Sequence, residues 1–163
     1  MEMTAKYIDV DIFGRCGNAT ACLSQRRGQC LLDLLRPYKF YLAFESAFCP
    51  DYLTEKIFKT FLSDNHIVPV VMGETEYDQY FPKGSLINID WFPTARELAV
   101  YLQGLDPETY SGYLEVKDMY QTLPGYSILC QVCDALVKQS MKPKIYDIKS
   151  WLEEGCPSPR SKF

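Results

Sequence analysis

The sequence lacks the features that mark several large classes of protein. It contains one histidine, and its net charge of -4 offers no basic footprint for a nucleic acid. No apolar run approaches the roughly 20 residues of a membrane-spanning helix, and the first residues carry acids where a signal peptide is apolar. We therefore expect no nucleic acid partner, and membrane attachment only through an anchor that this chain does not contain.

The sequence does contain the material for a folded core. Its 163 residues are 47% hydrophobic and 14% aromatic, and these values favour a globular chain over a disordered one. The length fits one domain, or one half of a two-domain protein. We expect residues 1–155 to form one domain and residues 156–163 to form a tail.

The cysteine content points to an oxidising compartment. Seven cysteines are many for a cytosolic chain, and Asn18-Ala19-Thr20 is a glycosylation acceptor in a loop-like segment. We expect disulfides to hold this loop, among Cys16, Cys22 and Cys30. Because seven is an odd number, at least one cysteine stays free or pairs outside the chain. The other four cysteines are Cys49, Cys130, Cys133 and Cys156.

No metal site is predicted. The Cys130-x-x-Cys133 pair has the spacing of half a zinc site or of a redox pair. With His66 as the sole histidine and no second pair of this spacing, the sequence does not complete a zinc site. Asp9-Val10-Asp11 has the spacing of a motif that holds a nucleotide diphosphate through a metal, but it falls inside a predicted strand.

The apolar pattern alternates strands with helices. It predicts strands at residues 7–13, 39–44, 66–72 and 85–89. It predicts helices at residues 54–62, 94–105, 106–117, 127–139 and 145–154, the second of them opened by a capping box at Thr94 and Glu97. This alternation is typical of an α/β fold, a Rossmann-like and mainly parallel sheet flanked by helices.

The stretch from residue 38 to residue 62 combines a strand, a polar loop and a helix start. Ligands of open α/β sheets bind beyond the carboxyl ends of the strands, and free N–H groups at a helix start attract anions. Lys56 would add a positive charge beside a phosphate, and Glu45 and Glu55 are suited to accept hydrogen bonds from sugar hydroxyls. These residues predict a nucleotide-type site.

The same stretch carries a family resemblance. The residues Phe44-Glu45, Tyr52-x-Thr54-Glu55-Lys56 and Val68-Pro69-Val70-Val71-Met72-Gly73 resemble the signature of the α1,3-fucosyltransferases, and the similarity runs from about Tyr7 to Cys133. Those enzymes transfer fucose from GDP-fucose to an acceptor glycan with inversion. The resemblance implies the C-terminal, donor-binding half of a GT-B glycosyltransferase in the Golgi lumen, with no required cofactor. It also implies that Cys130 and Cys133 form structural disulfides.

The resemblance assigns a role to each residue of the signature. Lys56 would contact the diphosphate, Glu55 the ribose, and Tyr52 the nucleotide. Glu45, Ser46 and Thr54 complete the donor site, although Ser46 stands where the family has an asparagine and lacks its amide groups. Each residue also has an ordinary interpretation. Lys56 and Glu55 would then be solvated first-turn residues, Tyr52 a core aromatic and Glu45 a capping residue.

No catalytic residue is predicted within this sequence. An inverting transferase needs a base for the acceptor hydroxyl, and in the family this base is thought to lie in the N-terminal, acceptor-binding half. We therefore expect this chain alone to bind GDP weakly and to transfer little or no fucose. Two alternatives remain open. One is a non-catalytic truncated binding module, and the other is an unrelated cysteine-rich interaction domain.

Overall fold

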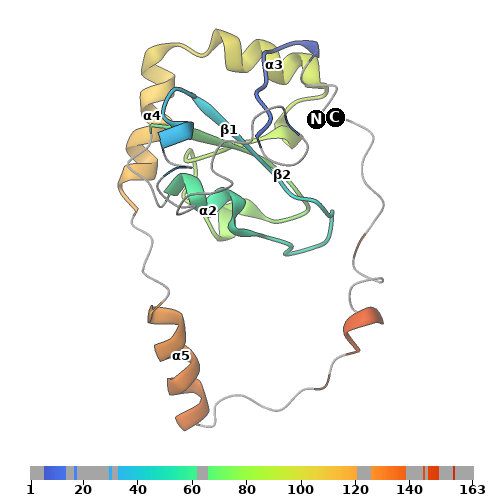
Figure 1. Ribbon diagram of the computed structural model, residues 1–163, viewed down its shortest axis with the longest axis vertical. Helices are drawn as coiled ribbons and strands as arrows, with labels where there is room; N and C mark the ends of the chain where they lie inside the picture. The colour runs from blue at the N-terminus through green and yellow to red at the C-terminus, as the bar shows by residue number, and fades with distance from the viewer. Residues whose placement is uncertain are drawn as a thin grey trace.

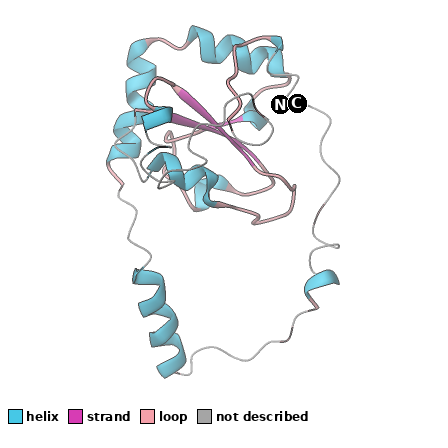
Figure 2. Ribbon diagram, in the orientation of Figure 1, coloured by secondary structure: helices cyan, strands magenta, loops and turns pink. Residues whose placement is uncertain are grey.

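The computed structural model describes residues 6–13, 17, 30, 33–61, 66–120, 126–138, 145, 147–150 and 156. Strands and helices alternate as far as η3, and three α-helices then follow one another (Figure 2). In chain order the elements are β1 (Phe40–Phe44), α2 (Glu55–Phe61), β2 (Val68–Met72), η2 (Tyr77–Gln79), β3 (Ile87–Asn88), η3 (Ile89–Trp91), α3 (Ala95–Gly104), α4 (Pro107–Asp118) and α5 (Tyr126–Val137).

The described strands form one parallel sheet in the order β1-β2-β3. Phe40 of β1 lies opposite Val68 of β2, and Val70 of β2 lies opposite Ile87 of β3. Parallel neighbours require a crossover, and α2 makes the one between β1 and β2. The predicted α/β fold is therefore confirmed, with a sheet of three strands whose carboxyl ends meet at one edge.

Successive side chains of each strand face opposite layers. Phe44 of β1 packs in a core cluster with Leu98 and Leu102 of α3, whereas its neighbour Ala43 packs in a second cluster with Ile57 of α2. In Figure 1, α3 and α4 accordingly lie on one side of the sheet and α2 lies on the other. Most of β2 is fully buried between these layers, which explains its continuous apolar sequence.

The helices predicted at residues 94–105, 106–117 and 127–139 are confirmed as α3, α4 and α5. Capping side chains explain where the first two begin. The Thr94 hydroxyl accepts a hydrogen bond from the Glu97 backbone N–H at the start of α3. Asp106 accepts one from the Thr109 backbone N–H at 2.9 Å, with Pro107 as the first residue of α4. Of the helix predicted at 145–154, the structure describes helical residues at 148–150.

The strand predicted at residues 7–13 is wrong. Residues 9–12 have no regular secondary structure, and only Phe13 forms a bridge. Alternating apolar and acidic side chains give a segment the periodicity of a strand but do not supply a partner backbone. In the structure, Asp11 accepts a hydrogen bond from the Tyr38 hydroxyl at 2.6 Å, so a side chain rather than a strand ladder holds the segment beside β1.

The disulfide prediction for α5 is also wrong. Cys130 and Cys133 are exposed free thiols on this helix, which lies apart from the sheet in Figure 1. Cys49 is bonded instead to Cys156, in the segment expected to be a tail. Cys30 is disulfide-bonded, whereas Cys16 and Cys22 lie outside the described residues, so the pairing predicted among the three stays a prediction.

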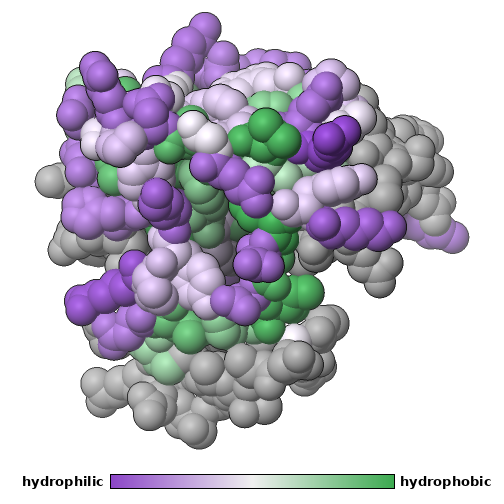
Figure 3. All heavy atoms as spheres, turned by 90° about the horizontal axis from the view of Figure 1, so that it is seen from above, coloured by the Kyte–Doolittle hydropathy of each residue, from purple (hydrophilic) through white to green (hydrophobic). Residues whose placement is uncertain are grey.

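The surface of the described part is mixed in character. On the face drawn in Figure 3, hydrophilic side chains cover most of the described surface, and hydrophobic ones gather between them. None of the helices that the structure describes has the length and apolar character needed to cross a bilayer.

Candidate functional site

The residues of the signature gather where β1 ends and α2 begins. Glu45 follows β1 directly, and its backbone N–H donates to the Met72 carbonyl at 2.9 Å, so the ladder with β2 extends to this point. The loop that leads from Glu45 to α2 is fixed at its middle. Pro50 forms an isolated bridge with Glu74, and Cys49 is held by its disulfide.

The Glu45 carboxylate is buried, and both of its oxygens accept hydrogen bonds. The residue is 4% exposed. Its Oε1 accepts from the Thr54 backbone N–H at 2.9 Å, and its Oε2 accepts from the Thr54 hydroxyl at 2.7 Å and from Lys56 Nζ at 2.9 Å. A buried carboxylate is costly unless it is paired and hydrogen-bonded, and these contacts meet that requirement. They support the capping interpretation of Glu45 over direct contact with a sugar.

Lys56 lies at the boundary between this buried pair and the surface. Its side chain is 28% exposed, against 1% for Glu45. A lysine ammonium has three N–H donors, so its bond to Glu45 leaves donors for an anion. The pairing also fixes the position of the ammonium group. A lysine held in this way provides a localised positive charge at the carboxyl edge of the sheet.

The remaining signature residues are held less tightly. The hydroxyl oxygens of Ser46 and Tyr52 lie 3.4 Å apart, at an exposed position. Glu55 pairs with Lys59 one turn along α2 at 3.1 Å, and this hydrogen bond lowers the pKa of its carboxyl. The structure therefore joins Glu45, Thr54 and Lys56 in one group and joins Ser46 to Tyr52, while Glu55 contacts Lys59.

Sequence reasoning assigned no role to Tyr77, whose side chain approaches Gly73 as that of Glu45 does. A Cβ atom added to Gly73 would lie 2.7 Å from the Tyr77 hydroxyl oxygen and 3.5 Å from Glu45 Cγ. Tyr77 is 4% exposed, and its hydroxyl is the one buried side-chain polar atom of the described residues with no hydrogen-bond partner. Burial raises the pKa of the Tyr77 hydroxyl, and the Glu45 charge adds to this. The signal available in the sequence was Gly73 itself, at the end of a buried strand.

Tyr77 lines a cavity of about 260 Å³ at the carboxyl ends of β2 and β3. We call it the polar cavity and define it by Glu74, Tyr77, Asn88, Asp90 and Trp91. It adjoins the signature residues, because the Thr75 hydroxyl, also in its lining, donates to the Tyr52 carbonyl at 3.3 Å.

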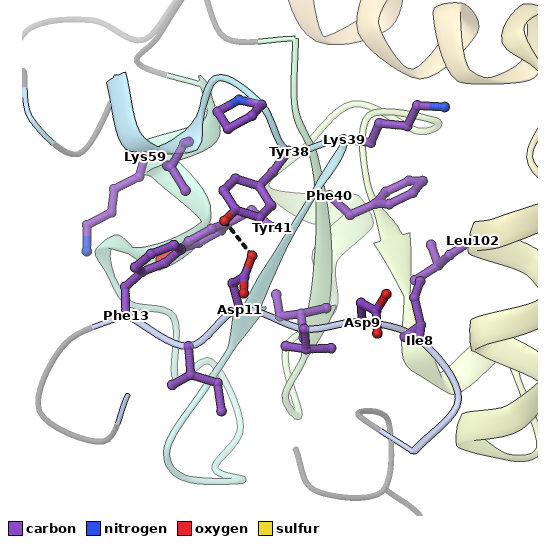
Figure 4. Close-up of a pocket in the computed structure, with 15 residues that line it drawn as sticks. Ile8, Asp9, Asp11, Phe13, Tyr38, Lys39, Phe40, Tyr41, Lys59 and Leu102 are labelled. Carbon is purple, nitrogen blue, oxygen red and sulfur yellow. Dashed lines mark hydrogen bonds between the residues drawn. The ribbon is translucent and has the colours of Figure 1, made fainter. Parts of the chain in front are cut away.

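A second cavity, of about 530 Å³, lies between residues 8–13 and the edge of β1. Figure 4 shows Ile8, Phe40 and Leu102 at one end of it and the hydrogen bond from Tyr38 to Asp11 near its centre. This hydrogen bond raises the pKa of Tyr38. None of the predicted site residues lines this cavity, so the candidate site comprises the signature residues and the polar cavity.

The described residues contain no group of three or more His, Cys, Asp or Glu side chains that could hold a metal ion.

Comparison with known proteins gives a family match over most of the chain. The family described as glycosyltransferase family 10 (fucosyltransferase), C-terminal, matches residues 1–151. The glycoprotein 3-alpha-L-fucosyltransferase A of Drosophila melanogaster is 40% identical over 153 residues, which are 90% of this chain and 30% of that protein. Human alpha-(1,3)-fucosyltransferase 4 is 36% identical over 157 residues, 91% of this chain and 29% of that protein.

A third relative carries an acceptor in its name. The human 4-galactosyl-N-acetylglucosaminide 3-alpha-L-fucosyltransferase is 32% identical over 152 residues, 89% of this chain and 38% of that protein. This chain thus spans about a third of the length of the relatives it matches.

Proposed function

Because the chain belongs to glycosyltransferase family 10, the fucosyltransferases, we propose that it forms the part of an α1,3-fucosyltransferase that binds the donor, GDP-fucose. The observation that carries this proposal is the position of Lys56. Its ammonium group is held 2.9 Å from buried Glu45, partly exposed, at the edge of the sheet where ligands of α/β folds bind. A nucleoside diphosphate is the kind of anion that such a charge recognises.

Each signature residue has a role in this proposal. Lys56 donates hydrogen bonds to the diphosphate, and Glu45 and Thr54 hold Lys56 and the start of α2 in place. Tyr52 and Ser46 lie beside the nucleotide. Glu55, exposed in the first turn of α2, accepts hydrogen bonds from the ribose hydroxyls.

The reaction we propose for the whole enzyme is a single displacement in a GT-B architecture. The acceptor hydroxyl oxygen forms a bond to the anomeric carbon of fucose, while the bond from that carbon to the diphosphate breaks on the opposite face. GDP leaves with the bonding electron pair, and the acceptor proton passes to a base. Attack opposite to the leaving group inverts the anomeric centre. We expect the base to come from the part of the relatives that this chain does not span.

The acceptor and the compartment belong to the same proposal. The names of the relatives support a glycoprotein or a galactosyl-N-acetylglucosaminide as acceptor. The disulfide between Cys49 and Cys156 suits an oxidising compartment, and we propose the Golgi lumen.

The test is calorimetric titration of the purified, oxidised chain with GDP. We expect weak binding that Lys56→Ala reduces about tenfold or more, because hydrogen bonds to charged groups contribute about 1.5–3 kcal/mol. Lys138→Ala is the matched control, since Lys138 is an exposed lysine directly after α5 that pairs with Asp134. It should leave GDP binding unchanged.

A second variant guards against unfolding, because Lys56→Ala leaves the Glu45 carboxylate buried without its cation. The double variant Glu45→Gln, Lys56→Met removes both charges at nearly constant volume and should also lose GDP binding. Equal binding by both variants and the wild type would contradict the proposal. A folded wild-type chain that does not bind GDP would favour a non-catalytic module.

A further inference from the structure

We propose that Asp51 is a positioning residue for nucleotide recognition. Its left-handed backbone conformation places Tyr52 beside the nucleotide, and its carboxylate ties the signature loop, residues 45–54, to the segment after β2. This inference rests on the proposed function, which brings a nucleotide to Tyr52. It assigns a role to a residue outside the signature and gives that residue no contact with the ligand.

Asp51 has a backbone conformation that residues with a Cβ atom seldom adopt. Its φ is 58°, and it is the one non-glycine residue with a positive φ in the part of the chain that the structure describes. Aspartate and asparagine tolerate this left-handed region better than other such residues, whereas a β-branched residue there is a true outlier. Strained conformations persist where the surrounding structure determines them, and they cluster at functional sites.

The positive φ belongs to a tight turn between β1 and α2. The Tyr52 backbone N–H donates to the Cys49 carbonyl at 3.1 Å, so Pro50 and Asp51 are the two central residues of this turn. The ring of Pro50 fixes a negative φ. A negative φ followed by a positive one defines a type II turn, in which glycine is usual at the position of Asp51. The conformation of Asp51 therefore sets the direction in which the chain enters Tyr52.

The side chain of Asp51 gives a reason for aspartate in place of glycine. Its Oδ1 accepts a hydrogen bond from the Tyr80 hydroxyl at 3.4 Å. Tyr80 directly follows η2, so this contact joins the signature loop to the segment after β2. The two residues before Asp51 are also tied, since Pro50 bridges to Glu74 and Cys49 is disulfide-bonded. A glycine would relieve the strain but would not form the contact with Tyr80.

The contacts of Tyr52 depend on this direction of the chain. Its carbonyl accepts a hydrogen bond from the Thr75 hydroxyl at 3.3 Å, and its hydroxyl oxygen lies 3.4 Å from that of Ser46. A right-handed or extended conformation at Asp51 would turn Tyr52 away from both partners. Asp51 thus acts on the nucleotide through Tyr52.

The test is calorimetric titration of the purified 163-residue chain with GDP, using three variants of Asp51. Asp51→Val disfavours the left-handed conformation and removes the carboxyl group. Asp51→Gly removes the carboxyl group but permits the conformation, and Asp51→Asn keeps both the conformation and an oxygen acceptor. Asp9→Val is the matched control, since Asp9 is an exposed aspartate outside the candidate site and has no positive φ.

We expect Asp51→Val to weaken GDP binding about fivefold to thirtyfold, because binding must restore the disfavoured conformation. Asp51→Asn should stay within about twofold of the wild type, and Asp51→Gly, which loses the contact with Tyr80, within about threefold. Asp9→Val should leave the affinity unchanged. Thermal unfolding of each variant separates binding from stability. A merely structural role would lower the Tm of Asp51→Val without changing the affinity of the folded chain.

A double-mutant cycle tests whether Asp51 acts through Tyr52. Tyr52→Ala removes the ring that we place beside the nucleotide, so adding Asp51→Val to this variant should weaken GDP binding by less than about twofold. Full additivity of the two losses would overturn the positioning role, because Asp51 would then act independently of Tyr52.

The outcomes separate this inference from the proposed function. A loss of affinity in Asp51→Val that Asp51→Asn and Asp51→Gly do not share supports the inference. Equal losses in all three variants would assign the effect to the carboxylate charge and overturn it. If the wild-type chain binds GDP and no variant differs from it, the inference is overturned and the proposed function stands. If the folded wild-type chain binds no GDP, both are overturned.

Discussion

The Glu45 carboxylate and the Tyr77 hydroxyl belong to two buried side chains that both approach Gly73, and the described residues supply hydrogen bonds to only one of them. Glu45 accepts three hydrogen bonds from Thr54 and Lys56. Tyr77 is equally buried, and its hydroxyl has no partner. Both groups approach the same glycine, but the carboxylate accepts three hydrogen bonds and the hydroxyl forms none.

The difference separates two kinds of buried polar group. A group whose hydrogen bonds are complete in the free protein stabilises the fold around it and gains little from a ligand. A buried group without a partner raises the free energy of the folded protein. We therefore assign a positioning role to Glu45, which holds Lys56 and the start of α2.

The largest expected effect tests the positioning role. Glu45→Ala removes the acceptor of three hydrogen bonds and leaves the partly buried Thr54 groups to find other partners. We expect the free energy of unfolding to fall by about 2–4 kcal/mol, measured by urea denaturation. Ser46→Ala, at the exposed neighbouring position, is the control and should change it by less than about 0.5 kcal/mol. A loss below about 1 kcal/mol for Glu45→Ala would mean that its hydrogen bonds add little to stability, as expected of the unpartnered Tyr77 hydroxyl.

An intermediate effect is expected at Gly73, the glycine that both groups approach. Gly73→Ala places a methyl group 2.7 Å from the Tyr77 hydroxyl oxygen, and overpacking of this kind costs about 1–3 kcal/mol. Because Tyr77→Phe removes that oxygen, the cost should fall by about 1 kcal/mol in the double variant. A double-mutant cycle of urea denaturation measures this coupling. Additive effects would mean that the methyl group meets a different neighbour.

Much of this arrangement was predictable from local sequence patterns. The capping residues Thr94 and Asp106 act within three residues of the groups they bind, and the continuous apolar run of β2 reflects burial on both faces. A strand, a loop and a helix start in succession predicted that Glu45 and Lys56 gather at one edge of the sheet, but not that they form an ion pair.

The rest depends on contacts that no local pattern encodes. Tyr77 becomes part of the site because Gly73 lets it approach β2, and its spacing gives no sign of an unpartnered hydroxyl. The disulfide between Cys49 and Cys156 spans 107 residues. Residues 7–13 have the alternation of a strand, yet a side-chain bond to Tyr38 holds them.

The smallest expected effect concerns Glu55, the exposed counterpart of Glu45. Its pKa is lowered first by the hydrogen bond from Lys59. A carboxyl with a depressed pKa adds stability above its unfolded pKa, and this stability is lost as the pH falls through the folded pKa. Because Glu55 lies in solvent, which screens the pair, Lys59→Ala should change the free energy of unfolding by less than about 0.5 kcal/mol.

The same variant should raise the pKa of Glu55 toward its ordinary value, which an NMR titration of the side-chain carboxyl would follow. Lys83→Ala, which removes an exposed lysine paired with Asp78, is the control and should leave this titration unchanged. A large stability loss for Lys59→Ala would mean that the exposed pair of Glu55 stabilises the fold as the buried contacts of Glu45 do. A small loss together with the pKa change would show that Glu55 is available to a ribose in a way that Glu45 is not, since it can give up Lys59 at little cost.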